Sequence, residues 1–244
     1  MRLVTWIITA TLVVCGSLSS AHALQSATDL FEKARKDAIM YRRVALYSEA
    51  LALDAGLAEA LKERGILYYY QGKLQEAYDD LTAYLEKGGE DIRGFLYRAL
   101  VSVKREDWAN ALADLNRACA LDPKRSDILS HRAVVLYKLG RSAEAEKDAA
   151  AVLALHDDPA AMARALTVRG NIYADRGNVF SAREDHRRAA SLDPTLGVFG
   201  TWGDILSPEQ ASRIGLLGLI VLPAFLIFRI RLPKPTRKDP PASP

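Results

Sequence analysis

A repeat of 34 residues runs through the middle of this 244-residue chain. Small residues recur at this interval at Ala77, Ala111 and Ala145, and Ala182 follows 37 residues later. The same steps separate two further sets of positions: Asp80, Asp114, Asp148 and Asp185, and Gly72, Glu106, Gly140 and Gly177. A period of this length indicates a stack of similar supersecondary units that share one continuous core. The late step of 37 indicates three inserted residues between positions 156 and 162.

The residues within each unit resemble the tetratricopeptide repeat, a helix–turn–helix unit of 34 residues. Unit 58–91 matches its skeleton at Leu61, Gly65, Tyr68, Ala77 and Leu81. Unit 92–125 matches at Ala99, Ala111, Leu115, Ala118 and Pro123; unit 126–162 at Leu129, Ala133 and Ala145; unit 163–196 at Leu166, Gly170, Tyr173, Ala182, Ala189 and Pro194. Unit 24–57 keeps only the second half, at Tyr47, Ala50, Leu53 and Asp54. The resemblance implies an all-α solenoid of four clear repeats and one degenerate repeat over residues 24–196.

Residues 1–23 have the three parts of a secretory signal peptide. Arg2 precedes an uncharged apolar run over residues 3–15, and Ala21-His22-Ala23 fits a cleavage site before Leu24. The mature chain is therefore predicted to leave the cytoplasm. An uncleaved N-terminal anchor is the alternative.

A second apolar run, residues 214–228, contains no charged or polar side chain. Ser207 to Gln210 fit a capping box with proline at the first helical position. We therefore predict a transmembrane helix over residues 208–232, with a linker at 197–207 and a basic tail at 233–244. Arginine and lysine are retained on the cytoplasmic side, which places the repeats outside the cytoplasm. A buried terminal helix of a soluble protein is the alternative.

Charge and composition offer little support for other functions. The net charge is +3, and the residues from Arg229 onward contribute +4 (five basic residues against Asp239), which leaves −1 for the rest. This balance is not typical of nucleic-acid binding. His131, His156 and His186 fall in different predicted elements without a second ligand at metal spacing, and no catalytic motif is present. We expect no enzyme activity, metal, cofactor or small-molecule substrate, and we expect Cys119 to be a buried, inert thiol.

The resemblance implies that the first helices of the units line a surface that binds an extended peptide or a helix. Its usual groove positions fall on Lys62, Ile66, Tyr69, Tyr70, Leu96, Leu100, Val103, Lys104, Val134, Tyr137, Lys138 and Asn171, with Ser130, Thr167 and Asp175 beside them. These residues form an apolar and aromatic floor edged by lysines, which suits an apolar segment with some negative charge. Alternatively, Tyr69, Tyr70 and Tyr137 only cover the core.

Together these features predict a membrane-tethered, extracytoplasmic adaptor that binds another envelope protein or peptide segment in its groove. The predicted location is the inner membrane, with a single span, periplasmic repeats and a cytoplasmic tail. A structural subunit of a membrane complex, assembled through the transmembrane helix, is the alternative. An accessory enzyme or metal carrier is a second alternative.

Overall fold

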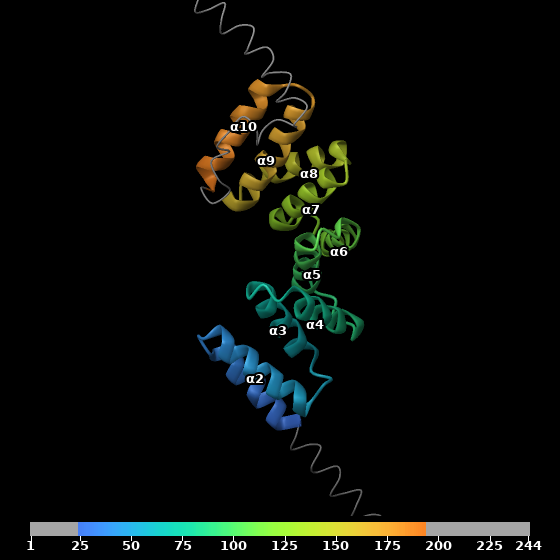
Figure 1. Cartoon of the computed structure of the whole chain (residues 1–244), viewed down its shortest axis with the longest axis vertical. Helices are drawn as coiled ribbons and strands as arrows, with labels where there is room; N and C mark the ends of the chain where they lie inside the picture. Colours follow the sequence, from blue (N-terminus) through green and yellow to red (C-terminus); the bar gives the residue numbers. More distant parts are fainter. Residues whose placement is uncertain (1–23, 194–244) are drawn as a thin grey trace, which may run out of the picture.

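The computed structural model describes residues 24–193 of the chain, and this part is all α. Its ten helices form five consecutive pairs (Figure 1). The pairs are residues 24–36 with α2 (Met40–Leu53), α3 (Ala58–Tyr70) with α4 (Leu74–Glu86), α5 (Ile92–Lys104) with α6 (Trp108–Leu121), α7 (Ser126–Lys138) with α8 (Ser142–Leu155), and α9 (Pro159–Asp175) with α10 (Val179–Leu192).

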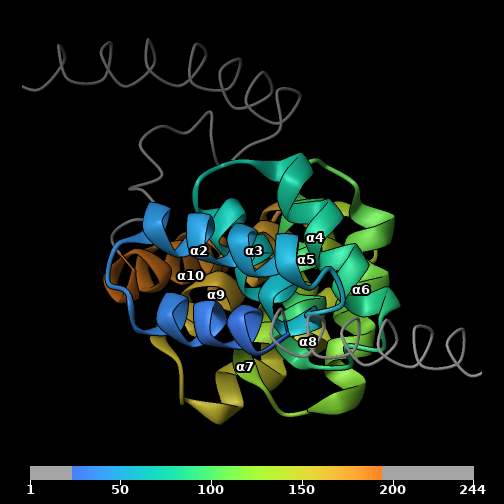
Figure 2. The same ribbon diagram turned by 90° about the horizontal axis from the view of Figure 1, so that it is seen from below.

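From α2 onward, each helix packs against the next one in the chain. The pairs follow one another along the long axis of the molecule in Figure 1, and they overlap when that axis is viewed from its lower end in Figure 2. The predicted all-α repeat solenoid is confirmed. The predicted signal peptide, transmembrane helix and basic tail lie outside the described residues. Within residues 24–193, none of the helices combines the length and apolar character needed to cross a bilayer.

The first pair contains a first helix that the repeat pattern did not reveal. Ala27 and Ala34, seven residues apart, are fully buried on helix 24–36. Phe31 of the same helix packs against Tyr47 of α2, with ring centroids 5.5 Å apart. This unit therefore contributes apolar residues of its own to a core that it shares with α3 and α4, although it lacks most of the repeat skeleton.

Small residues allow the two helices of a pair to cross closely. A Cβ atom added to Gly65 of α3 would lie 2.9 Å from Cγ of Leu81 and 3.3 Å from the backbone oxygen of Ala77, both on α4. A Cβ atom at Gly170 of α9 would lie 2.9 Å from the ring of His186 on α10. Helix packing at such a short distance excludes a larger side chain at either glycine.

The turn between the helices of a pair explains another repeated position. Gly72, Gly140 and Gly177 have φ angles of +74°, +74° and +77°, a left-handed conformation that glycine adopts without steric cost. The next residue closes the turn; for example, the Lys73 N–H donates to the Tyr68 carbonyl over 2.9 Å. Glu106 occupies the same place after α5, with φ of +58°.

The three inserted residues between positions 156 and 162 lengthen α9 at its start. This helix has 17 residues, whereas α3, α5 and α7 have 13 each. It begins at Pro159, and the Asp158 carboxylate caps it by accepting hydrogen bonds from the N–H groups of Ala160 and Ala161. The longer helix packs against both α7 and α8.

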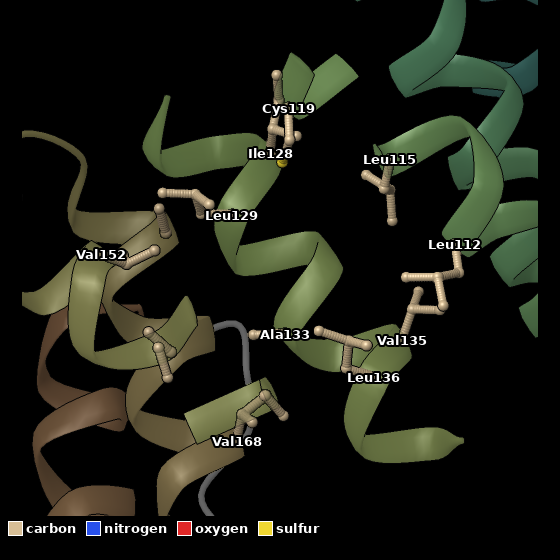
Figure 3. Packing of buried hydrophobic residues seen from close by; sticks show 14 of the residues in the cluster. Leu112, Leu115, Cys119, Ile128, Leu129, Ala133, Val135, Leu136, Val152 and Val168 are labelled. Carbon is tan, nitrogen blue, oxygen red and sulfur yellow. The ribbon is translucent and has the colours of Figure 1, made fainter. Parts of the chain in front are cut away.

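One apolar cluster connects the third, fourth and fifth pairs (Figure 3). Leu115 of α6, Ile128 and Val135 of α7 and Val152 of α8 are fully buried in it. Cys119 is also buried in this cluster as a free thiol, and burial raises its pKa. Because nucleophilic reactivity requires the thiolate, this environment favours an inert side chain, as predicted.

A ladder of arginine–aspartate pairs joins the two helices of four units. Arg64, Arg98, Arg132 and Arg169 each donate two hydrogen bonds to the aspartate 16 residues later, namely Asp80, Asp114, Asp148 and Asp185. Three of these arginines also reach the preceding unit, where Ser48, Thr82 and Asn116 accept a hydrogen bond. All four aspartates are buried, and the cationic partner of each one compensates the cost of burying its charge.

Candidate protein-binding surface

The structure divides the predicted groove residues into three groups by exposure. Tyr70, Lys104 and Lys138 are exposed. Half-buried are Tyr69, Leu100, Val103, Val134, Tyr137 and Asn171. The remaining three, Lys62, Ile66 and Leu96, are buried, and they present little surface to a partner.

Lys62 is held in a buried polar cluster at the junction of the second and third units. Its ammonium group forms ion pairs with Asp91 and Glu59 and lies over the ring of Tyr84, 5.0 Å from the centroid. Burial opposes the charge on Lys62, but the hydrogen bonds to these two carboxylates outweigh it and raise its pKa. The Asp91 carboxylate also caps α5 by accepting from the Gly94 N–H over 2.6 Å. Lys62 therefore stabilises the fold here and does not edge the groove.

Ile66 and Leu96 belong to the apolar core. Ile66 packs with Ala77, Leu81 and Val101 between the second and third units. Leu96 is part of the large cluster that continues through α7 to α9. Ile66 still forms part of the wall of a cavity described below.

Three tyrosines form an aromatic cluster where α3 and α5 meet. The rings of Tyr69 and Tyr70 on α3 and of Tyr97 on α5 contact one another edge to face, with centroids 5.4–5.8 Å apart. The hydroxyl oxygens of Tyr70 and Tyr97 are 2.6 Å apart and share one hydrogen bond. Burial and this bond raise the pKa of Tyr97, and burial raises the pKa of Tyr69. Both phenols therefore remain neutral near pH 7.

Tyr97 was not among the predicted groove residues, although the sequence contains a signal for it. Arg93, Tyr97, Leu100 and Lys104 follow one another at steps of four, three and four residues. This spacing places all four on one face of α5. We predicted only the last two of these residues, together with buried Leu96.

A cavity of about 410 Å³ lies beside this tyrosine cluster. Residues of three successive units line it. Its apolar walls come from Ala38, Met40, Ile66, Leu67, Tyr70 and Tyr97, and its charged groups from Arg43, Glu63 and Arg93. Arg93 Nη1 lies 2.9 Å from Glu63 Oε1, and Arg43 Nη2 lies 3.9 Å from Glu63 Oε2. One carboxylate is thus placed between two guanidinium groups.

A second aromatic position lies further along the solenoid. The Tyr137 hydroxyl of α7 donates to the Asp175 carboxylate of α9 over 2.9 Å. Burial, followed by this hydrogen bond, raises the pKa of Tyr137 to about 12. The bond fixes the ring in one orientation, so that a partner would meet a preorganised aromatic side chain.

The histidines are distributed over separate elements: His131 on α7, His156 at the end of α8 and His186 on α10. Among residues 24–193, no group of three or more histidine, cysteine, aspartate or glutamate side chains has the arrangement of a metal site. The cavity and the tyrosine cluster offer a partner aromatic, apolar and arginine side chains.

Comparisons with known proteins found likeness in structure alone, since no family model and no curated protein matches the chain. YrrB, described as a TPR protein with an unusual peptide-binding site, is 28% identical and has a TM-score of 0.55 over 70% of this chain and 94% of its own. MamA has a TM-score of 0.60 at 18% identity, over 72% of this chain and 94% of its own. A tetratricopeptide repeat protein from Parabacteroides merdae has a TM-score of 0.59 at 22% identity, over 70% of this chain and 68% of its own.

The likeness covers the described solenoid and agrees with its local features: paired helices, glycines at the crossings and left-handed turns at the repeat interval. Together, these observations show that the described part of the chain has the fold of tetratricopeptide-repeat proteins.

Proposed function

We propose that this protein is a membrane-tethered, extracytoplasmic scaffold that binds a segment of another envelope protein. The observation that carries the binding role is the tyrosine cluster, Tyr69, Tyr70 and Tyr97, beside a cavity. Tetratricopeptide-repeat neighbours, one of them described by its peptide-binding site, support a role in protein interaction.

The aromatic side chains suit this role because they offer much contact area at little cost in conformational entropy. Tyr70 is 59% exposed, and its ring is held by two neighbouring rings and by the hydrogen bond to Tyr97. Energetic hot spots of protein interfaces are enriched in such rigid aromatic anchors. Tyr137, fixed by Asp175, provides a second anchor for an extended partner.

The tether and the location rest on the sequence. The predicted helix at residues 208–232 follows the repeats after a short linker, so it would hold the binding surface close to the membrane. Confinement near one surface raises the effective concentration of other membrane-associated partners without any new contact.

The binding role is tested by partner capture with the full-length chain. The pair of changes Tyr69→Ala and Tyr137→Ala should lower capture by about fivefold or more, a loss of more than about 1 kcal/mol. Cross-linking in intact cells, followed by identification and quantification of the bound protein, provides the measurement. Phe180→Ala is the control, because Phe180 is 91% exposed on α10 and lines no part of the cavity beside the tyrosine cluster. Unchanged capture by the double variant, with helix content intact, would place the binding surface elsewhere.

The topology is tested with cysteines introduced one at a time into the full-length chain, and the unchanged chain, with its own two cysteines, gives the background. Lys104→Cys, at an exposed site on the repeats, should react with a membrane-impermeant maleimide added from the periplasmic side. Lys238→Cys, in the tail, should react only after the inner membrane is opened. The reverse pattern would exclude the proposed orientation, and recovery of the protein without the membrane would exclude the tether.

A further inference from the structure

The cavity beside the tyrosine cluster has the dimensions and walls of a side-chain pocket. Its volume of about 410 Å³ falls within the range of ligand pockets, roughly 300–1,000 Å³. Met40 and Tyr70 at its walls are 41% and 59% exposed, so apolar surface remains in contact with water there. Covering this surface with an apolar side chain would release that water, which is the main favourable contribution to such contacts.

The charged groups of the cavity are unbalanced. Arg43 and Arg93 face a single carboxylate, that of Glu63, which leaves one excess positive charge. The Arg93 side chain is 49% exposed. Within residues 24–193 it makes one hydrogen bond, from Nη1 to Glu63, and its other donors bond to no protein atom. A guanidinium group donates to two oxygens at once, so Arg93 can hold a second carboxylate without releasing the first.

The tyrosine hydroxyls offer a further donor, because Tyr70 and Tyr97 also line the cavity. The contact between Tyr70 and Tyr97 uses the proton of one hydroxyl as donor and the oxygen of the other as acceptor. The second hydroxyl therefore keeps its proton. Either hydroxyl can be the donor of this bond, and in both cases one phenolic proton is available to a ligand oxygen.

We infer that this cavity binds an apolar side chain that has a carboxylate next to it in the partner's segment. The apolar walls receive the side chain, while Arg93 and the free tyrosine proton bind the carboxylate. The inference rests on the proposed function, and it specifies the chemistry of the partner: an acidic and apolar segment that contacts the first three units. Arg43, 28% exposed, adds to the positive potential behind Glu63.

An array of short synthetic peptides tests the inference on the full-length protein in detergent. Each peptide carries one leucine or phenylalanine, flanked by aspartate or glutamate in one class, by asparagine or glutamine in a second, and by lysine in a third. The acidic class should be retained at least about fivefold better than the neutral class, because one charge-assisted contact separates them. Arg93→Gln should remove this difference, and Arg93→Lys should restore part of it.

The chain provides a closely matched control. Arg176 pairs with Glu146, 30 residues earlier, as Arg93 pairs with Glu63, and its side chain is 51% exposed. Arg176→Gln should therefore leave peptide retention unchanged. Tyr70→Ala should weaken retention of all three classes, because it removes part of the apolar wall that they share.

Other outcomes would overturn the inference. Equal retention of acidic and neutral peptides, or retention that Arg93→Gln leaves intact, would contradict it, while the proposed scaffold role would still stand on the capture experiment. If the protein self-associates and Arg93→Gln dissociates it, the occupant is a second copy of the chain and not a partner's acidic segment. Failure of the capture experiment together with loss of all peptide retention would contradict both proposals.

Discussion

Glu106 occupies a backbone conformation that side chains other than glycine adopt only at a cost. The turns after α3, α7 and α9 have glycine at the corresponding place, whereas Glu106 has a φ angle of +58°. A left-handed conformation costs a residue with a Cβ atom about 1–2 kcal/mol, part of which glycine loses again through backbone entropy. Glu106→Gly should therefore stabilise the protein by about 0.5–1 kcal/mol, measured by chemical denaturation of the full-length chain.

The reverse change at an equivalent turn is the control. Gly140 has a φ angle of +74°, and a Cβ atom added there would meet no other atom within 4 Å. Gly140→Glu should therefore destabilise the protein through the backbone alone, by about 1 kcal/mol. If both substitutions changed the stability in the same direction, side-chain contacts, and not the φ angle, would decide stability at this turn.

His131 makes stability depend on pH. Burial, followed by the positive charge of Arg164, lowers its pKa from 6.5 to about 4, while Asp127 and Asp158 oppose that effect. Between these values the unfolded chain binds a proton that the folded chain does not, so stability falls as the pH drops. The loss between pH about 6.5 and about 4 should reach at most about 3 kcal/mol, and His131→Gln should remove it.

Comparing each protein at about pH 7 and at about pH 4.5 isolates this contribution. Burial also lowers the pKa of His186, but that residue is present in both proteins and cancels in the comparison. His156→Gln is the control, because it removes an exposed histidine at the end of α8. An unchanged pH dependence in His131→Gln would mean that the pKa of His131 is the same in the folded and the unfolded chain.

The crossing of α3 and α4 depends on the absence of a side chain at Gly65. A Cβ atom would already lie within 2.9 Å of Leu81 and within 3.3 Å of backbone oxygen, and backbone moves less readily than a flexible side chain. Gly65→Leu should therefore destabilise the protein by at least about 2 kcal/mol, although leucine favours helix formation more than glycine does. Thermal unfolding followed by circular dichroism would measure it.

A substitution to leucine at an exposed helical position is the control, because it changes helix propensity without changing the packing of the core. Arg42 is exposed on α2, so Arg42→Leu should change stability by less than about 0.5 kcal/mol. If Gly65→Leu were equally mild, α3 and α4 would have to separate without loss of core contacts. The crossing would then not explain the small residues of the repeat.

Helix pairs could be predicted from the sequence because the same backbone and packing requirements recur in each unit. Gly72 and Gly140 mark turns, and Gly65 and Ala77 mark a crossing, so their spacing reports local geometry directly. The arginines of the ladder share this period, but only the aspartates were among the predicted repeat positions. Their pairing would have followed from the constant separation of 16 residues.

The candidate site was less predictable because it depends on contacts between units. Lys62 has groove spacing on α3, but Asp91 comes from a loop 29 residues later and holds it in a buried cluster. The cavity requires Met40, Glu63 and Arg93, which come from three different units. Periodicity within one helix identifies a face, and it does not reveal which neighbouring residues cover that face.

The solenoid as a whole is stabilised mainly between neighbours, and the arginine ladder is part of that coupling. Arg98 joins α5 to α6 through Asp114, with a shortest N–O distance of 2.7 Å, and it reaches Thr82 on α4. Arg169 makes the same pair with Asp185, but the three-residue insertion makes Ala150 the counterpart of Thr82, and alanine offers no side-chain acceptor. The two arginines therefore differ in how many units they connect.

Arg98→Met and Arg169→Met should both destabilise the protein by about 2–4 kcal/mol, because each leaves a buried aspartate without its partner. The two variants should differ in which helices become less stable. In a linear array with nearest-neighbour coupling, Arg98→Met should raise amide hydrogen exchange in α4, α5 and α6, and Arg169→Met mainly in α9 and α10. Arg183→Met, at an exposed site of α10, should leave exchange unchanged. A uniform increase over all the helices in both variants would show instead that the solenoid opens as one cooperative unit.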